Sequence, residues 1–342
     1  MRKLLNTLYV TKEDTYLAKD GSNIVVKQNG EKVFQSPVQN FENIICFTYV
    51  GMSPALMGLC IEKNVSVSFL TPWGKLQGKL VGPTRGNVLL RREQYRIADS
   101  DIRLSYAKLF VFGKIYNSVK VLQRSFRDNE KIDNRLDIEQ SILKLKESKD
   151  NTKSANSLNE LLGIEGDSSR EYFKVFDNLI LQNKNDFKFN GRYRRPPTDP
   201  VNAMLSLSYG MVRVLLENAL ETVGLDPYVG FYHTDRPGRT SLALDMMEEL
   251  RAYMADRFVL TLINRKQINI DHFVTKENGA VLFTEEGLKV FLNLWNKRNQ
   301  ETIKHPFLEE NVEIGLIPYV QSMLLARTIR GDLELYPPFF MN

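Results

Sequence analysis

The chain has 342 residues, of which 43% are hydrophobic and 25% charged, a composition typical of globular proteins that excludes a disordered or fibrous chain. The formal net charge of +5 permits a polyanionic partner but is too small to require one. The length exceeds that of most single domains, so we expect two domains, each large enough to bury its own core.

The first segment, MRKLLNTLYVTKED, carries basic residues without the apolar run of a secretion signal, and no later stretch is long and apolar enough to span a bilayer. The two cysteines, Cys46 and Cys60, lie in apolar sequence and are too few for a zinc site. We therefore expect a cytoplasmic protein with reduced, buried thiols and no membrane contact.

Residues 24 to 82 are predicted to be rich in β-structure. Apolar residues alternate or come in short runs in NIVVKQNGEKVFQS, VSVSFL and GKLQGKLVG, and Asn29 followed by Gly30 is a type I′ hairpin signal. One helix is predicted inside this region, because Ser53 can cap it, Pro54 suits its first position, and PALMGLCIEKN follows with helical periodicity.

Beyond Arg85 the apolar residues recur at three- and four-residue spacing, which predicts long amphipathic helices. RGNVLLRREQYR, Arg85 to Arg96, is the expected boundary segment, and ESKDNTKSANS, Glu147 to Ser157, is expected to be a solvated loop. The sequence thus predicts an α+β fold, with a small β-rich domain at residues 1–84, a connecting segment at 85–100 and a larger all-α domain at 101–342.

The segment GFYHTDRPGRTSLALDMMEELR, Gly230 to Arg251, places one of the three histidines in a loop before an acidic helix. Asp245 and Glu248 are three residues apart on that helix and share a face, and paired carboxylates can hold a hard divalent cation. His233 could meet them in space, because the proline and glycine that follow it can turn the chain back.

The same segment could instead have a purely structural role. Met246, Met247 and Leu250 could pack inward while the acids and Arg251 face water, and a single histidine more often has a polar structural role. A third carboxylate, Glu165 in LLGIEGDSSREYFKVF, could join a site or could be an acid favoured by the dipole at a helix N-terminus.

KFNGRYRR, Lys188 to Arg195, carries four basic residues and no acid, with Phe189 and Tyr193 interleaved. Arginines among aromatic side chains suit phosphate contact together with base stacking, whereas the plainer alternative is a solvated loop. The boundary segment at Arg85 to Arg96 is a second basic cluster.

Taken in order, LLGIEG, NGRYRRPPTDPVNAMLSLSYG and GFYHTDRPGRTSLALDMMEELR closely resemble the CRISPR adaptation integrases, a family of metal-dependent proteins that insert new spacers into CRISPR arrays. The ordered trio of a GIEG glutamate, a G-x-x-H histidine and a D-x-x-[DE] helix makes the match specific over most of the helical part. RRPPTDPVNA and the YPPFF ending look most like the subtype that accompanies type I-C systems.

The resemblance implies that Mg²⁺ or Mn²⁺ is held by three catalytic ligands, Glu165, His233 and Glu248, with Asp245 and Asn202 in support. Many family members carry aspartate where this chain has Glu248, so it stays open which carboxylate reaches the ion. One imidazole with two or three oxygens suits these ions better than a thiolate site would. The candidates for nucleic-acid contact are Arg192, Tyr193, Arg194, Arg195 and Arg239.

In the family the attacking group is a DNA 3′-hydroxyl, so the protein aligns DNA and a metal ion and supplies no covalent nucleophile. The resemblance implies double-stranded DNA partners (incoming spacer and CRISPR repeat), a homodimer, a small ferredoxin-like adaptation subunit and, as a further candidate, an iron–sulfur exonuclease of the same module. The β-rich domain would serve dimerisation and DNA contact. Two alternatives stay open: a non-catalytic DNA-binding scaffold, and a general metal-dependent nuclease for branched DNA.

Overall fold

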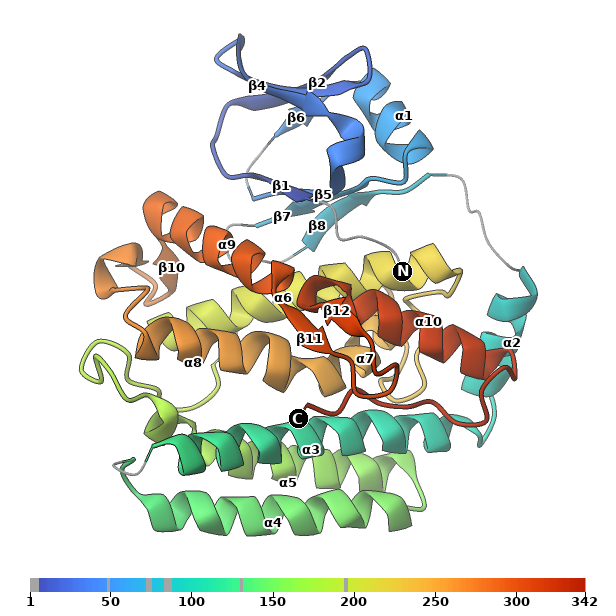
Figure 1. Cartoon of the computed structure of the whole chain (residues 1–342), viewed down its shortest axis with the longest axis vertical. Helices are drawn as coiled ribbons and strands as arrows, with labels where there is room; N and C mark the ends of the chain where they lie inside the picture. The colour runs from blue at the N-terminus through green and yellow to red at the C-terminus, as the bar shows by residue number, and fades with distance from the viewer. Residues whose placement is uncertain are drawn as a thin grey trace.

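The chain forms a β-rich N-terminal region that sits on a larger, mostly helical region (Figure 1). The computed structural model describes residues 6–47, 50–71, 76–82, 88–129, 132–193 and 196–341. Three residues of the two basic clusters, Arg85, Arg194 and Arg195, lie outside these ranges. The fold is therefore mixed α+β, with the β-structure concentrated at the N-terminal side, as predicted.

Two four-stranded sheets make up most of the N-terminal region. One has the order β1 (Asn6–Val10), β5 (Phe41–Cys46), β7 (Ser66–Leu70), β8 (Leu76–Leu80), and the other β4 (Glu31–Pro37), β3 (Asn23–Gln28), β2 (Thr15–Asp20), β6 (Gly51–Met52). In the first sheet β1, β5 and β7 are parallel and β8 is antiparallel to β7. Buried residues of both sheets, among them Leu17 and Ile44, form one hydrophobic core with helix α1 (Pro54–Glu62).

The local signals of this region are confirmed. Asn29 and Gly30 have φ angles of 51° and 85° and join the antiparallel strands β3 and β4, as a type I′ turn requires. Ser53 caps α1 by accepting a hydrogen bond from the backbone N–H of Leu56 at 3.2 Å. Cys46 and Cys60 are free and buried; burial raises the pKa of the Cys46 thiol to about 12.

The remaining described chain is built mainly from helices. They are α2 (Val88–Ala98), α3 (Arg103–Asp128), α4 (Arg135–Ser154), α5 (Leu158–Lys174), α6 (Pro200–Val223), α7 (Ser241–Arg251), a π-helical segment (Ala252–Asp256), α8 (Arg257–Asn264), α9 (Glu285–Gln300) and α10 (Ile317–Ile329). Short 3₁₀ turns lie at Val38–Asn40, Phe176–Leu179, Ile270–His272 and Ile314–Leu316. Within the described ranges, no helix combines the length and apolarity needed to cross a membrane.

Two details of the predicted helical region are wrong. Two antiparallel hairpins, β9 (Phe273–Thr275) with β10 (Val281–Phe283) and β11 (Thr302–Lys304) with β12 (Asn311–Glu313), interrupt the helices. The expected loop at Glu147 to Ser157 is mostly the last turns of α4, which continues to Ser154. Lysine and glutamate favour helices even where apolar residues are lacking, so polarity alone did not mark a loop there.

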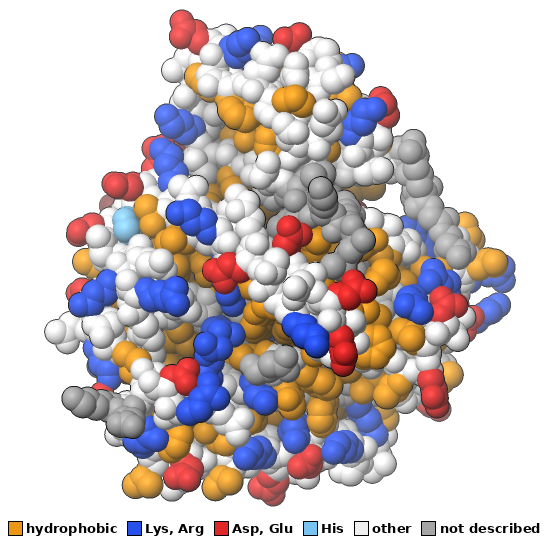
Figure 2. Space-filling view, viewed as in Figure 1, with side chains coloured by type: hydrophobic (Ala, Val, Ile, Leu, Met, Phe, Trp, Pro, Cys, Tyr) orange, Lys and Arg blue, Asp and Glu red, His pale blue; other side chains and the backbone are white. Residues whose placement is uncertain are grey.

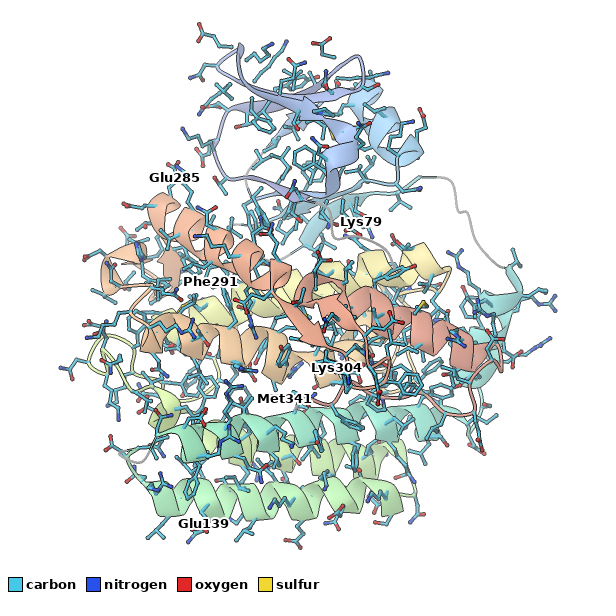
Figure 3. The ribbon with its side chains drawn as sticks, in the orientation of Figure 1. Lys79, Glu139, Glu285, Phe291, Lys304 and Met341 are labelled. Atoms are coloured by element: carbon cyan, nitrogen blue, oxygen red, sulfur yellow. The ribbon has the colours of Figure 1, made fainter. Side chains whose placement is uncertain are left out.

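Polar side chains join the two regions. Lys79 of β8, labelled in Figure 3, makes a 2.5 Å ion pair with Glu221 of α6, and Asn218 of α6 donates to Asn43 of β5 at 2.8 Å. On the face shown in Figure 2, Lys and Arg side chains are spread among acidic ones over the helical part. The net positive charge is therefore not gathered into a single stripe on this face.

The C-terminal segment ends inside the helical region, next to α3, where Figure 3 labels the buried Met341. Asn117 of α3 is fully buried, donates to the carbonyl oxygens of Glu249 and Phe339 at 2.7 Å each, and accepts from the N–H of Met341 at 2.9 Å. The Glu249 carboxylate accepts from the N–H of Phe339 at 2.8 Å and from the hydroxyl of Tyr336. Helix α7 is thus tied on one side to the end of the chain.

Replacing Asn117 with Ala should destabilise the fold, because it strips partners from buried backbone groups of α7 and of the C-terminal segment. Each such group left unsatisfied typically costs about 1–3 kcal/mol, so we expect a loss of at least about 2 kcal/mol in unfolding free energy. Urea unfolding measures it, with the exposed Asn151→Ala of α4 as the control. Equal unfolding midpoints for the two variants would show that the anchor contributes nothing.

Candidate active site

Helix α7 carries four buried ionisable residues, Asp245, Glu248, Glu249 and Arg251, with exposed fractions of 0%, 3%, 0% and 9%. The alternative in which these side chains face water is wrong. Both α3 and α6 pack against α7, so nearly all of this short helix is covered by other parts of the protein. Buried charges are expensive unless they are paired, and the partners of each residue therefore indicate its role.

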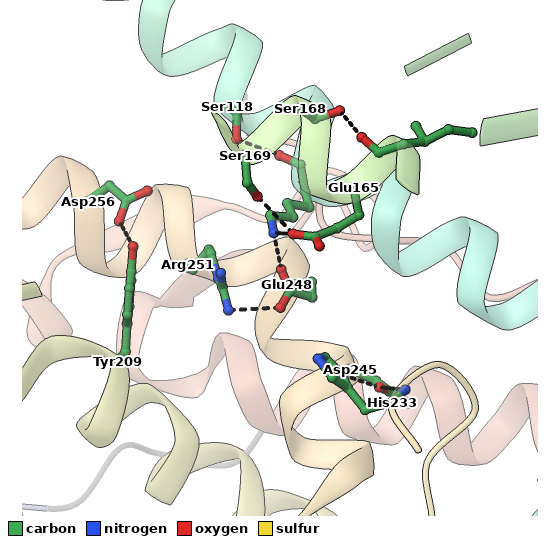
Figure 4. A network of polar contacts seen from close by, with 12 residues as sticks. Ser118, Glu165, Ser168, Ser169, Tyr209, His233, Asp245, Glu248, Arg251 and Asp256 are labelled. Atoms are coloured by element: carbon green, nitrogen blue, oxygen red, sulfur yellow. Dashed lines mark hydrogen bonds and ion pairs between the residues drawn. The ribbon is translucent and has the colours of Figure 1, made fainter. Parts of the chain in front are cut away.

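Asp245 organises the loop that carries His233. One carboxylate oxygen accepts from the N–H groups of Phe231 and Tyr232 at 2.6 and 2.9 Å; the other accepts from the N–H of His233 at 2.8 Å and lies 2.7 Å from its Nδ1 (Figure 4). A Cβ at Gly230 would lie 2.8 Å from this carboxylate, which explains the glycine there. Asp245 thus fixes the imidazole through Nδ1 and leaves Nε2 as the nitrogen for another partner.

Glu165 and Glu248 approach each other from α5 and α7 (Figure 4). The ammonium of Lys114, on α3, pairs with both: it lies 2.7 Å from Glu248 Oε2 and contacts Glu165 Oε1. The other oxygen of Glu248 accepts from Arg251 at 2.8 Å. Burial acts to raise the pKa of Glu248, but Arg251 and Lys114 outweigh it and lower that pKa to about 2. Glu248 is therefore ionised at neutral pH.

Glu165, His233 and Glu248 all line one cleft of about 690 Å³. The basic residues that line the same cleft are Arg192, Arg213, Arg239, Arg251 and Lys276. Basic side chains thus outnumber the two carboxylates. A cleft with more basic than acidic side chains suits a polyanion. The arginines would neutralise its negative charge, and its reacting group would lie near the carboxylates.

The site differs in one respect from the metal site that the sequence predicts. Among the described residues, no three His, Cys, Asp or Glu side chains stand close enough together to hold a metal ion as they are. The ammonium of Lys114 lies between the two carboxylates instead. Glu165 lies in the middle of α5, which begins at Leu158, so the alternative of an acid at a helix N-terminus is wrong.

The predicted supporting and DNA-contacting residues are partly described. Asn202 is fully buried near the start of α6; its side-chain oxygen accepts from Arg192 at 2.7 Å and from the N–H of Tyr193 at 3.0 Å, and its amide donates to the carbonyl of Gly191 at 2.8 Å. Arg192 also donates to Ser206, and this hydrogen bond holds the arginine at the cleft. The alternative of a freely solvated loop is therefore wrong at Arg192. Tyr193 is 51% exposed.

Sequence reasoning missed Lys114, Tyr209 and Asp256. The ring of Tyr209 lies 5.2 Å from the guanidinium of Arg192 and 5.1 Å from that of Arg251, and its hydroxyl donates to Asp256 at 2.5 Å. Asp256 ends the π-helical segment after α7, and such segments recur at functional sites. A lysine within the apolar stretch around residue 114 was the one available sequence signal.

Replacing Asp256 with Asn should stabilise the protein above pH 7. Burial raises the pKa of Asp256 from 3.8 to about 6, so folding holds its proton more tightly than the unfolded chain does. Wild-type stability therefore falls as pH rises from about 4 through about 6, whereas Asn resembles the protonated acid at every pH. The urea unfolding midpoint of Asp256→Asn should exceed that of wild type at about pH 7.5, and the difference between the two proteins should be smaller at about pH 4.5. A pH-independent difference would contradict the raised pKa.

The fold and the cleft define a mixed α+β protein with buried carboxylates in a basic, polyanion-suited site. The family model of the CRISPR associated protein Cas1 matches residues 8–297. The chain is 44% identical to a CRISPR-associated endonuclease Cas1 of Chlorobaculum tepidum and 42% identical to one of Rhodospirillum rubrum, with 99% of each chain covered in both cases. The chain belongs to the Cas1 family.

Solved structures share this fold. A Cas1 protein from Thermotoga maritima matches with a TM-score of 0.82 at 21% identity over 98% of this chain and all of its own. A casposase bound to integration product matches with a TM-score of 0.82 at 24% identity, over 97% of this chain and 92% of its own. A chain of a Cas6-RT-Cas1–Cas2 complex matches with a TM-score of 0.83 at 20% identity, over 100% of this chain and 37% of its own.

A relative with an additional domain is also found. An exonuclease Cas4/endonuclease Cas1 fusion of Geobacter sulfurreducens is 34% identical over 97% of this chain, which covers 60% of the fusion.

Proposed function

We propose that this protein is a divalent-metal-dependent DNA endonuclease and integrase, which inserts spacer DNA into a CRISPR array through attack of a DNA 3′-hydroxyl on a phosphodiester. The observation that carries the proposal is that Glu165, His233 and Glu248, from three separate elements, line one basic cleft. The activity is proposed to take place in the cytoplasm.

The donor set fits Mg²⁺ or Mn²⁺. The carboxylates of Glu165 and Glu248 already converge on one cation, the ammonium of Lys114, and Asp245 leaves only Nε2 of His233 for a further partner. Oxygen ligands with one imidazole suit these ions. Glu165, His233 and Glu248 would hold the ion, which would stabilise the charge that develops on the phosphodiester during in-line displacement. Asp245 would act by fixing His233.

The remaining cleft residues would hold the DNA backbone. Arg192, Arg239 and Lys276 line the cleft and would neutralise phosphates. Phosphates are common to all DNA sequences and therefore suit a protein that captures varied spacers. Tyr193, half exposed, is proposed to stack on a base. Arg194 and Arg195 join this set on sequence grounds alone.

Two similar proteins support the partners proposed for this chain. The Cas6-RT-Cas1–Cas2 complex supports a proposal that a small Cas2-type subunit, the ferredoxin-like partner, binds this chain. The Cas4/Cas1 fusion supports a Cas4-type exonuclease as a further partner. We also propose a homodimer in which the β-rich region takes part in dimerisation and DNA contact, and assignment to the type I-C subtype on the wording of its motifs.

Product analysis distinguishes this activity from its alternatives. Wild-type protein with a Cas2-type partner, Mn²⁺ and a 3′-hydroxyl duplex should join that duplex to a repeat-bearing plasmid. A non-catalytic scaffold would bind both DNAs and leave them unchanged, and a general nuclease would cut a branched substrate without joining. The converging carboxylates favour the enzyme, because a scaffold needs only the basic residues.

Replacing Arg239 with Ala should weaken DNA binding and reduce its salt dependence. Under counterion release, the slope of log affinity against log salt becomes shallower by about 0.9 for each lost phosphate contact on duplex DNA. Fluorescence anisotropy over a salt series measures the slope, with Arg127→Ala as the control, since Arg127 is 75% exposed on α3 and does not line the cleft. An unchanged slope would assign Arg239 a role other than phosphate contact.

A further inference from the structure

Lys114 is a lysine in an unusual position. Its side chain is only 6% exposed, and Ile115 and Val111 beside it on α3 are part of the hydrophobic core. An ammonium in such surroundings is stable only with charged partners. Both partners are the carboxylates proposed above as metal ligands, Glu165 and Glu248.

Further hydrogen bonds to each of the two carboxylates support their pairing with Lys114. Ser169 donates to Glu165 Oε1, the oxygen that also contacts Lys114, at 2.8 Å. Arg251 donates to Glu248 Oε1 and leaves Glu248 Oε2 to the ammonium. Figure 4 shows the carboxylates of Glu165 and Glu248 directed toward the same space. Lys114 thus neutralises the region in which the two carboxylates could share an ion.

We propose that Lys114 is the resident cation of this site: it holds Glu165 and Glu248 together in the metal-free protein and competes with the divalent ion for them. The inference rests on the proposed function. A carboxylate oxygen that ligates Mg²⁺ at about 2.0–2.1 Å cannot keep the ammonium in the same place, and the two cations repel. Lys114 must therefore release at least one carboxylate when the ion binds.

This competition has two opposite consequences for a variant that lacks the ammonium. Lys114→Met leaves the buried carboxylate of Glu248 and the partly buried one of Glu165 without their shared cation, so the metal-free protein should melt at a lower temperature than wild type. The same variant should bind Mn²⁺ about tenfold more tightly or better, because the ammonium no longer repels the divalent ion or occupies its carboxylate ligands. Mn²⁺ should then raise its melting temperature more than that of wild type.

The test measures Mn²⁺ binding by electron paramagnetic resonance, and thermal melting with and without Mn²⁺, on protein alone. Lys108→Met is the matched control: it removes the same charge from α3, where the Lys108 ammonium donates to the carbonyl of Lys153 away from the cleft. Tighter binding by Lys114→Met than by wild type and Lys108→Met supports the proposal. Equal or weaker binding overturns it, because Lys114 would then merely support the ligands.

Two further outcomes are decisive. If Lys114→Met does not fold without metal, Mn²⁺ must restore its folded state at concentrations below the wild-type dissociation constant. Lys114→Gln is then measured in the same way. If Mn²⁺ restores neither variant, the proposal that Lys114 competes with the divalent ion is overturned. If wild type itself binds no Mn²⁺, the metal-dependent function proposed above is wrong, whatever the variants do. The two ideas thus fail through different observations.

Discussion

Replacing His233 with Ala should lower DNA joining by about 100-fold or more while DNA binding survives. The variant removes a proposed nitrogen ligand but keeps Glu165 and Glu248, and Asp245 still accepts the N–H groups of Phe231 and Tyr232. The loop and the basic cleft should therefore stay in place. An ion lost or misplaced where negative charge develops on the phosphodiester accounts for the expected loss.

The comparison for His233→Ala pairs plasmid joining with DNA retention at equal protein concentration, and thermal melting confirms the fold. His272→Ala is the control histidine variant, since His272 does not line the cleft. Joining at the wild-type rate by a folded His233→Ala protein would exclude His233 as a catalytic metal ligand. Loss of DNA binding with intact folding would instead favour the scaffold alternative.

Replacing Glu248 with Gln should damage both activity and stability. Joining should fall by about 100-fold or more, since a proposed metal ligand loses its charge. Lys114 and Arg251 also lose the carboxylate between them, and breaking a buried ion pair by removing one partner typically costs about 3–5 kcal/mol. Urea unfolding at pH 7 measures the stability, with the exposed Glu139→Gln of α4 as the control.

The same variant should differ from wild type in its response to acid. The pKa of Glu248 is lowered from 4.5 to about 2, so its contribution to stability is present above pH 4.5 and is lost as pH falls toward 2. The stability gap between wild type and Glu248→Gln should therefore narrow over that range. A gap that stays constant between pH 5 and 3 would contradict the buried, ionised state of Glu248.

Local sequence signals predicted the local structure well. Asn29-Gly30 and Ser53-Pro54 define a turn and a helix start through their own backbone preferences, so no distant residue was needed. The acidic helix was different: its amphipathic pattern suggested a solvated face, because a sequence does not show that α3 and α6 cover both sides of α7. Burial of Glu248 depends on packing rather than on spacing.

The sequence predicted carboxylates and an imidazole for the candidate site, but it did not predict the lysine cation that lies between the carboxylates. The resemblance of the motifs to a known family pointed to Glu165, His233 and Glu248, and the structure places them along one cleft. Lys114 lies in a separate helix, far from both carboxylates in the chain, and no local pattern links it to them. The role of Asp245 in holding the His233 loop likewise depends on tertiary hydrogen bonds.

The most direct test of the proposed integrase chemistry is the dependence of joining on the 3′-hydroxyl. The protein and its Cas2-type partner would be incubated with Mn²⁺, a repeat-bearing plasmid and a duplex ending in either a 3′-hydroxyl or a 3′-deoxy terminus. We predict joined product with the 3′-hydroxyl duplex only, and its loss on addition of a metal chelator. Equal joining of both duplexes, or joining that persists with the chelator, would contradict metal-dependent attack by the DNA 3′-hydroxyl.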